Sequence, residues 1–137
     1  MTTLPPLTTE TLWAILNNEL PDDTVNEMVW HYLGYRRADD RVDDRENDRE
    51  NDLGNGEWLL EDVDTIWAQK YPTPPNFIES RPATVQLTRS IPKENKQLLK
   101  TLLGFKGYSV DQLVPRLTRR ATMANWLLSE MRKRELV

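Results

Sequence analysis

The sequence is 137 residues long, which fits one domain over residues 1–137, and its apolar content is only 38%. It contains no cysteine, so disulfides, thiolate nucleophiles and cysteine-ligated zinc or iron–sulfur sites are excluded. The net charge of −4 is unevenly distributed along the chain. Residues 1–70 form an acidic half with six Lys and Arg against seventeen Asp and Glu, and residues 71–137 form a basic half with twelve Lys and Arg against five Asp and Glu. Such an asymmetry is typical of an interaction role.

The sequence carries no sign of a membrane span or of export. No stretch approaches about 18 consecutive apolar residues. The N-terminal segment MTTLPPLTTE also lacks the basic region and the apolar run of a signal peptide. We therefore expect no membrane insertion and a cytoplasmic location, which the lack of cysteine also suits.

Two short helices are predicted before Gly34. Apolar residues at positions 12, 15 and 16 share one helical face after a Thr-Thr pair that can cap it, and Pro21 closes this first helix. Thr24 and Glu27 have the spacing of a capping box. Apolar residues then recur at helical spacing up to Gly34, which supplies the stop of the second helix.

Residues 37–56 form a strongly acidic segment in which the unit DREN occurs twice. It has no aromatic residue and few aliphatic ones, so it cannot offset its ordering entropy by burial, and we expect a flexible acidic loop. From Glu46 onward its carboxylates match part of a calcium-loop frame, but Asn51 stands where that loop needs glycine. We therefore expect no metal site.

The middle of the chain has weaker patterns. Apolar residues between positions 59 and 67 form a short amphipathic stripe that ends at Tyr71, and the prolines that follow impose an extended path. Residues 84–88 alternate apolar and polar side chains, which predicts an extended segment or a strand. Nothing obvious in the chain pairs with such a strand.

Residues 90–134 predict a helix-turn-helix-like basic half, with the order helix, turn, short helix, tight turn and long helix. Pro92 is placed to begin the first of these helices, Pro115 to end the short one and Thr118 to cap the long one. The expected fold class is therefore mainly α, a small helical domain of five to six helices with at most one short strand or hairpin.

Arg119 and Arg120 fall at the exposed start of the long helix in this arrangement. Two cations at a helix N-terminus oppose the helix dipole at about 0.3–1 kcal/mol each, a local cost that phosphate binding would explain. The alternative is that these arginines pair with acids of the N-terminal half. The sequence leaves both interpretations open.

Most of the five tryptophans are expected to be core anchors distributed over the helices. Trp13 and Trp30 lie off the main apolar stripes of their helices. One or both are therefore candidates for an exposed position on a partner surface, where aromatic side chains often form the energetic centre.

The sequence holds no recognisable catalytic set. Its one histidine, His31, has no Ser, Cys or second His arranged to make it a base, and the five glycines form no phosphate-binding loop. Asp62 and Asp64 are the acids that an enzymatic reading would use, but no pocket is predicted around them. We therefore expect a protein that is not an enzyme and needs no cofactor.

The chain resembles a family of cyanobacteria and plant plastids called domain of unknown function 1823, in the strings WHYLGYR, YPTPPNFIESRPATVQLTRSIPKENKQLLK, LGFKGY and PRLTRRATMANWLL. The resemblance covers nearly the whole chain, and the acidic segment departs from it by its length and repetition. The family has no established activity, so no functional residue is carried over. The resemblance implies that the protein comes from an oxygenic phototroph and lies in the cytosol or the plastid stroma. It also implies a link to the maintenance of photosynthesis or of the organelle.

We therefore predict a non-catalytic macromolecule-binding protein, an adaptor or regulator, that contacts a protein partner through a basic helical face. The alternative is a helix-turn-helix protein that binds nucleic acid. The candidate contact residues are basic side chains of the C-terminal half and two tryptophans: Arg116, Arg119, Arg120, Lys93, Lys96, Lys100, Trp13 and Trp30.

Overall fold

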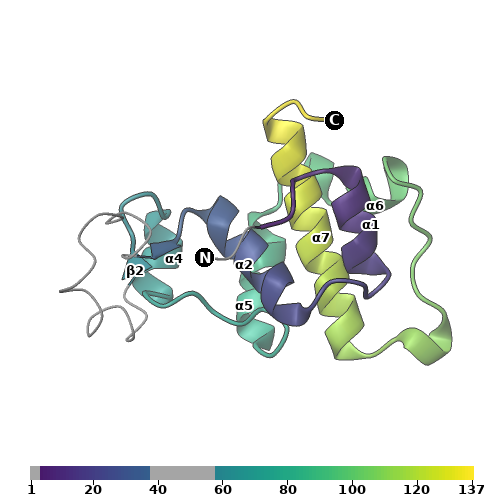
Figure 1. Ribbon diagram of the computed structural model, residues 1–137, viewed down its shortest axis with the longest axis horizontal. Coiled ribbons are helices and arrows are strands. Elements are labelled where there is room, and N and C mark those ends of the chain that lie inside the picture. The colour runs from purple at the N-terminus through teal and green to yellow at the C-terminus, as the bar shows by residue number, and fades with distance from the viewer. Residues whose placement is uncertain (1–3, 38–57) are drawn as a thin grey trace. The chain divides into compact units, whose positions relative to one another are not determined.

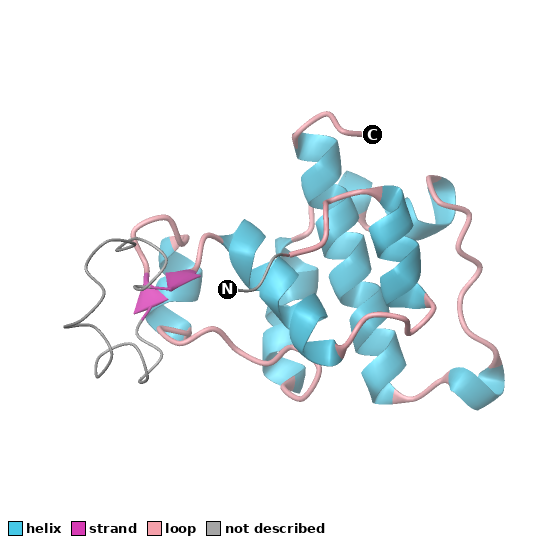
Figure 2. Cartoon of the chain, in the orientation of Figure 1, coloured by secondary structure: helices cyan, strands magenta, loops and turns pink. Residues whose placement is uncertain are grey.

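The computed structural model describes residues 4–37 and 58–137, so nearly all of the segment predicted as an acidic loop lies outside the described residues. The chain is mainly α-helical, which confirms the predicted fold class (Figure 1, Figure 2). It divides into two compact units, Met1–Val29 with Asn76–Val137, and Trp30–Pro75. The single domain over residues 1–137 stays a prediction.

The long helix α7, Pro115–Lys133, is the centre of the first unit. Helices α1 (Thr9–Leu16), α5 (Arg81–Ser90) and α6 (Leu98–Thr101) all pack against it (Figure 1). Fully burying one large aliphatic or aromatic side chain stabilises a fold by roughly 1.5–3 kcal/mol, so this packing is the main source of stability. The largest fully buried apolar side chains of the unit include Leu12, Ile15, Met28, Phe77, Leu87, Met123, Leu127 and Leu128.

The first two helices follow the sequence closely. Helix α1 is capped by Thr8, whose hydroxyl accepts a hydrogen bond from the amide of Thr11 at 3.2 Å. Helix α2, Asp22–Leu33, begins before the capping box predicted at Thr24. It ends at Gly34 as predicted, with φ of +109°, a conformation that favours glycine.

Residues 84–88 are helical, so the prediction of an extended segment or strand is wrong. They belong to α5, which is capped by Ser80, whose hydroxyl accepts a hydrogen bond from the amide of Ala83. Ala83, Thr84 and Leu87 are buried on one face of this helix. A lone strand would leave its backbone groups without partners, whereas a helix satisfies them internally.

The basic half keeps the predicted order of elements, but the shorter elements are single turns. They are the 3₁₀ turns Lys93–Asn95 and Val110–Gln112 and the one-turn helix α6. Helix α7 begins at Pro115 rather than at Thr118. Proline is favoured at the first helical position because its missing N–H is one of the donors left unpaired there, so Pro115 opens this helix instead of closing the preceding one.

The second unit contains the one strand pair in the described residues. Strand β1, Arg36–Arg37, pairs antiparallel with β2, Trp58–Leu59 (Figure 2), and helix α4, Thr65–Lys70, follows. The amphipathic stripe predicted over 59–67 is therefore divided between a strand, a turn and a helix.

Tyr35 is buried in the second unit, and its hydroxyl donates to the carbonyl of Tyr71 at 2.7 Å. Burial, together with the neighbouring Tyr71, raises the pKa of Tyr35 to about 12.

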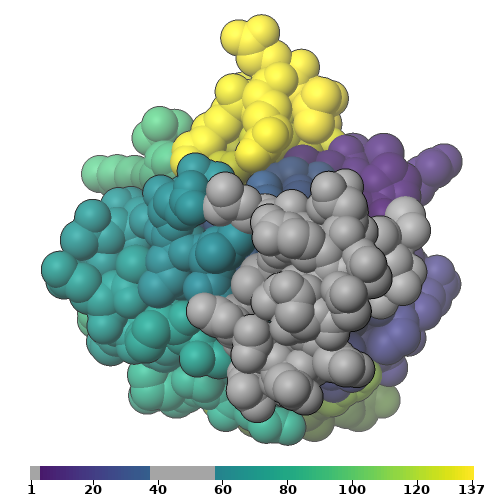
Figure 3. Space-filling model, turned by 60° about the vertical axis from the view of Figure 1, so that its left-hand side comes forward, coloured from purple at the N-terminus to yellow at the C-terminus, as the bar shows by residue number. Residues whose placement is uncertain are grey.

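The C-terminal end of the chain projects from the surface in the space-filling view (Figure 3). Leu136 and Val137 are exposed there.

Within residues 4–37 and 58–137, no helix combines the length and the apolarity that crossing a bilayer requires.

Candidate protein-binding groove

Arg120, predicted as an exposed contact residue, is fully buried. Its Nη1 atom donates to Asp22 Oδ1 at 2.7 Å. Its Nε and Nη2 atoms donate to the carbonyl of Ile15 at 3.3 and 3.1 Å, and Nη2 also donates to the carbonyl of Leu20 at 2.8 Å. The guanidinium therefore fixes the connection between α1 and α2 to α7. The predicted exposed position of Arg120 is wrong, because no part of this side chain reaches the surface.

Asp22 is shared by two arginines. Arg116 Nε donates to Asp22 Oδ2 at 2.9 Å, and Arg116 Nη2 donates to Asn18 Oδ1 at 2.9 Å. Burial raises the pKa of the Asp22 carboxyl, but the hydrogen bonds and charges of Arg116 and Arg120 outweigh it and hold the pKa below its ordinary value of 3.8. The interpretation in which arginines pair with acids of the N-terminal half is thus confirmed for Arg120, and Arg116 forms the same kind of pair.

Arg119 is half-buried and lies beside a pocket of about 420 Å³. Its Nη1 atom donates to the carbonyl of Ile78 at 2.8 Å, and no described carboxylate pairs with it. Arg81 of α5 contributes a second cation to this pocket, which we call the arginine pocket. Its full lining is Arg81, Thr84, Val85, Thr88, Leu113, Val114, Pro115, Thr118, Arg119 and Thr122.

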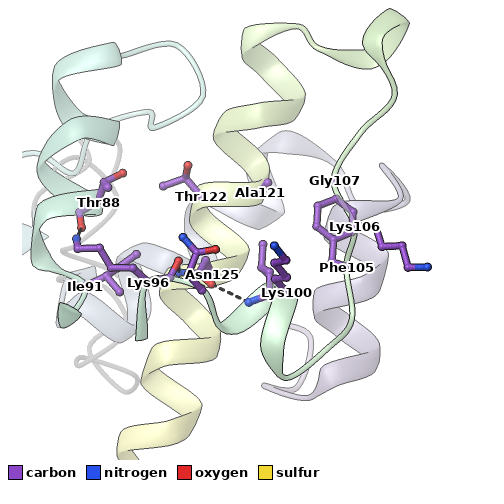
Figure 4. A pocket seen from close by; sticks show the side chains of 12 residues that line it. Thr88, Ile91, Lys96, Lys100, Phe105, Lys106, Gly107, Ala121, Thr122 and Asn125 are labelled. Carbon is purple, nitrogen blue, oxygen red and sulfur yellow. Dashed lines mark hydrogen bonds between the residues drawn. The ribbon is translucent and has the colours of Figure 1, made fainter. Parts of the chain in front are cut away.

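A second pocket, of about 480 Å³, is bordered by α5, α6, α7 and the turn after α6 (Figure 4). Three lysines, Lys96, Lys100 and Lys106, lie around it, and we call it the lysine pocket. The Lys96 Nζ atom donates to the carbonyl of Thr88 at 2.6 Å, near the end of α5. The apolar part of the lining is Ile91, Leu99, Phe105 and Ala121.

The two pockets share Thr88 of α5 and Thr122 of α7, so they adjoin along the seam between these helices. We call the joined pockets the basic groove. Among the residues that the structure describes, its lining holds five cations and no Asp or Glu. A concave surface lined by charges of one sign concentrates ligands of the opposite sign, so the basic groove is suited to an acidic ligand.

Asn125 of α7 holds the lysine pocket in place. Its Oδ1 atom accepts from the amide of Leu99 at 3.0 Å, and its Nδ2 atom donates to the carbonyls of Asn95 and Lys96 at 3.2 and 3.3 Å. The side chain of Asn95 in turn donates to Ser129 Oγ at 3.1 Å. These buried hydrogen bonds attach the start of α6, and with it the lysines, to α7.

The structure brings together only some of the predicted contact residues. Lys96, Lys100 and Arg119 line the basic groove. Lys93 is exposed but lines neither pocket. The sequence interpretation missed Arg81 and Lys106, which have no local pattern in common with the others and become neighbours only when α5 and the turn after α6 pack beside α7.

Trp13 is half-buried rather than exposed, so its predicted exposure is wrong. Its ring packs edge-on against Phe105, with centroids 6.0 Å apart, and Phe105 packs against Tyr108 in the same way at 5.2 Å. The Tyr108 hydroxyl donates to the carbonyl of Leu16 at 2.9 Å. This cluster positions Phe105 in the wall of the lysine pocket, so Trp13 supports the groove without forming its surface.

Trp30, in the second unit, is also half-buried, and the prediction of an exposed position is wrong for it too. Its Nε1 atom donates to the carbonyl of Pro75 at 2.7 Å, and its ring packs edge-on against Trp58 at 5.7 Å. Both tryptophans lie off the apolar stripes of their helices. They are nevertheless half-buried, because each packs against a part of the chain that is distant in the sequence.

The acids and the histidine considered for chemistry belong to the second unit. Asp62 and Asp64 are exposed and line neither pocket. The His31 ring packs edge-on against Tyr32, with centroids 4.8 Å apart. Among the described residues, no group of three His, Asp or Glu side chains is arranged to hold a metal ion. That the protein is not an enzyme stays a prediction.

Together these features define a small, mainly α-helical protein with a basic groove beside its longest helix. The chain belongs to the family of domain of unknown function 1823 (DUF1823), whose model matches residues 6–132. A structure solved by solution NMR is 49% identical in sequence, with a TM-score of 0.71, and the match covers 98% of this chain and 99% of that one. A search of curated proteins finds no match. The family resemblance is thereby confirmed.

Proposed function

We propose that this protein is a non-catalytic adaptor or regulator in the cytoplasm of an oxygenic phototroph, and that it binds an acidic segment of a partner protein in the basic groove. The observation that carries this proposal is the lining of the groove, which has five cations, apolar surface in both pockets and, in the described part of the chain, no carboxylate. Charge of one sign steers an acidic partner and selects against a basic one, while the apolar surface supplies affinity.

The cations of the groove are available to a ligand. The side chains of Arg81, Lys100 and Lys106 form no ion pair or hydrogen bond with the described residues, and those of Lys96 and Arg119 donate only to backbone carbonyls. By contrast, Arg116 and Arg120 are already paired with Asp22. A ligand in the groove therefore breaks no ion pair between residues that the structure describes.

Nucleic-acid binding, the alternative, has lost part of the feature that favoured it, because Arg120 is buried and paired with Asp22. The arginines at the start of α7 were unexplained in the sequence, and phosphate binding was one explanation for them. The carboxylate of Asp22 accounts for Arg116 and Arg120 without a phosphate. The apolar lining of both pockets also suits side chains of a protein better than a phosphate backbone.

The test is affinity capture from a cell lysate with and without nuclease, with the captured proteins identified by mass spectrometry. The wild type is compared with Lys100→Glu/Lys106→Glu, which reverses two exposed cations of the lysine pocket. The control is Lys93→Glu/Arg132→Glu, which makes the same change in net charge at exposed positions outside the groove.

We expect one acidic partner to survive nuclease treatment, to bind the control variant and to be lost by the groove variant. Loss of the partner on nuclease treatment would indicate that the protein binds nucleic acid. In that case the affinity should fall by about one log unit per log unit of salt concentration for each phosphate contacted. Equal loss in both variants would show that general positive charge, and not the groove, is responsible.

A further inference from the structure

The lining of the basic groove also indicates what shape of acidic segment fits it. We propose that the occupant is an amphipathic acidic helix that places two large apolar side chains, one turn apart, into the two pockets. This inference rests on the proposed function. Three features of the groove carry it: the hydrogen bonding of its threonines, the spacing of its pockets and the distribution of its charges and exposed apolar side chains.

The threonine hydroxyls of the groove are already used as donors. Thr84 donates to the carbonyl of Phe77, Thr88 to that of Thr84, Thr118 to that of Pro115 and Thr122 to that of Thr118, at 2.5, 3.1, 3.2 and 3.3 Å. An extended peptide pressed onto this seam would find none of these donors for its own carbonyls.

A helix avoids this difficulty because it pairs its own backbone groups. The groove also has no strand edge to which an extended peptide could add. Among the described residues β1 and β2 form the one strand pair, and neither strand lines the groove. The groove therefore favours a helical occupant over an extended one.

Along α7, the linings of the two pockets are offset by about one helical turn. On α7, the arginine pocket is lined by residues between 115 and 122 and the lysine pocket by residues between 121 and 125. The centres of these two sets are about four residues apart, which is about 6 Å at the helical rise of about 1.5 Å per residue. Apolar side chains at positions i and i+4 of a partner helix have the same separation along its axis and lie on one face.

The groove offers apolar and charged groups in the pattern that such a helix needs. In the arginine pocket Leu113 and Val114 are 57% and 44% exposed, which is high for large apolar side chains and leaves them available to be covered. The lysine pocket has Phe105 and Leu99 in its wall. Cations accompany the apolar groups in both pockets, so carboxylates that flank an apolar stripe find partners at each end.

The test uses labelled peptides rich in Glu and Ala and measures fluorescence anisotropy and circular dichroism. One peptide carries two leucines at positions i and i+4, a second has the same composition with leucines at i and i+2, and a third has a proline between the two leucines of the first. We expect the i, i+4 peptide to bind at least about fivefold more tightly than either of the others and to gain helicity on binding.

Two protein variants localise the contact. Leu113→Ala removes an apolar group of the arginine pocket and should weaken the i, i+4 peptide by about fivefold. Val110→Ala changes a residue that is 86% exposed and lines neither pocket. This variant should therefore bind the i, i+4 peptide as tightly as the wild type does. Both positions are exposed, so neither substitution disturbs the core.

The outcomes separate this inference from the proposed function. If all three peptides bind equally, or the proline peptide binds as well as the first, and binding still depends on Lys100 and Lys106, the helical occupant is wrong and the acidic-segment groove stands. If no peptide binds, or Lys100→Glu/Lys106→Glu binds as well as the wild type, both the inference and the proposed function are contradicted.

Discussion

Arg120 and Asp22, which lie 98 positions apart in the sequence, form an ion pair with 2.7 Å between Nη1 and Oδ1, and the guanidinium side chain is fully buried. Two backbone carbonyls receive its remaining hydrogen bonds. An arginine that a sequence pattern places at an exposed helix start is thus a structural group that fixes the connection between α1 and α2.

Replacing Arg120 by methionine should lower the free energy of unfolding by about 2–5 kcal/mol, because two backbone carbonyls lose their donor, whereas Asp22 is 34% exposed and keeps its pair with Arg116. Urea denaturation of the purified variant measures the loss. Arg116→Met is the matched control. Because the Arg116 side chain is 43% exposed, this substitution should lower the free energy of unfolding by no more than about 1 kcal/mol. Equal losses in the two variants would show that burial of Arg120 is not what matters.

Asp22 should make stability depend on pH in the acid range. Its pKa is below the ordinary value of 3.8 in the folded protein, so the unfolded chain takes up the proton first as the pH falls. The stabilisation of the folded state by the Asp22 carboxylate is therefore complete above the ordinary pKa of 3.8. It disappears as the pH falls through the lower pKa that Asp22 has in the folded protein. The stability difference between wild type and Asp22→Asn, followed by urea denaturation from about pH 6 to about pH 3, should be constant at first and then narrow. A difference that grows on acidification would contradict the ion-pair assignment.

Gly34→Ala should destabilise the protein more than Gly104→Ala. Both glycines have positive φ, +109° and +75°, so both substitutions carry a conformational cost of about 1 kcal/mol. A Cβ atom at Gly34 would also lie 2.2 Å from the carbonyl oxygen of Asp62, whereas one at Gly104 would have no atom within 4 Å. Thermal unfolding of the two variants measures the difference, and equal melting temperatures would mean that the Asp62 backbone moves aside freely.

Asn125→Ala should loosen the lysine pocket. It removes three hydrogen bonds that attach the start of α6 to α7, and each buried partner left unpaired costs about 1–3 kcal/mol. We expect faster hydrogen exchange at the amide of Leu99 and weaker binding of an acidic partner. Thr101→Ala, which removes only an exposed hydrogen bond within α6, should leave both properties near those of the wild type. Unchanged exchange at Leu99 would contradict the supporting role of Asn125.

Local patterns in the sequence predicted those parts of the fold that depend on neighbouring residues. The cap at Thr8, the stop at Gly34 and the mainly α-helical class are of this kind. Residues 84–88 were misassigned because five residues are too few to show a helical period, and the buried face of the helix includes Ala83 and Thr84 rather than Val85. Only the packing of α5 against α7 decides between a strand and a helix.

The basic groove was only partly predictable for a similar reason. Charge showed that the C-terminal half is basic, but it did not distinguish Arg120, which a carboxylate neutralises, from Lys100, which none of the described carboxylates does. That distinction depends on Asp22, an acid from the other end of the chain. Arg81 and Lys106 were missed because helix packing, and not spacing in the sequence, brings them to the groove.

Calorimetric titration of the purified acidic partner, once captured, against three forms of this protein tests the central claim most directly. The forms are the wild type, Lys100→Glu/Lys106→Glu and the control Lys93→Glu/Arg132→Glu. Reversal of two groove charges should weaken binding by at least about tenfold, because opposite charges that meet at an interface become like charges, while the control should bind within about twofold of the wild type. Equal affinities for the wild type and the groove variant would contradict the claim that the basic groove binds the partner.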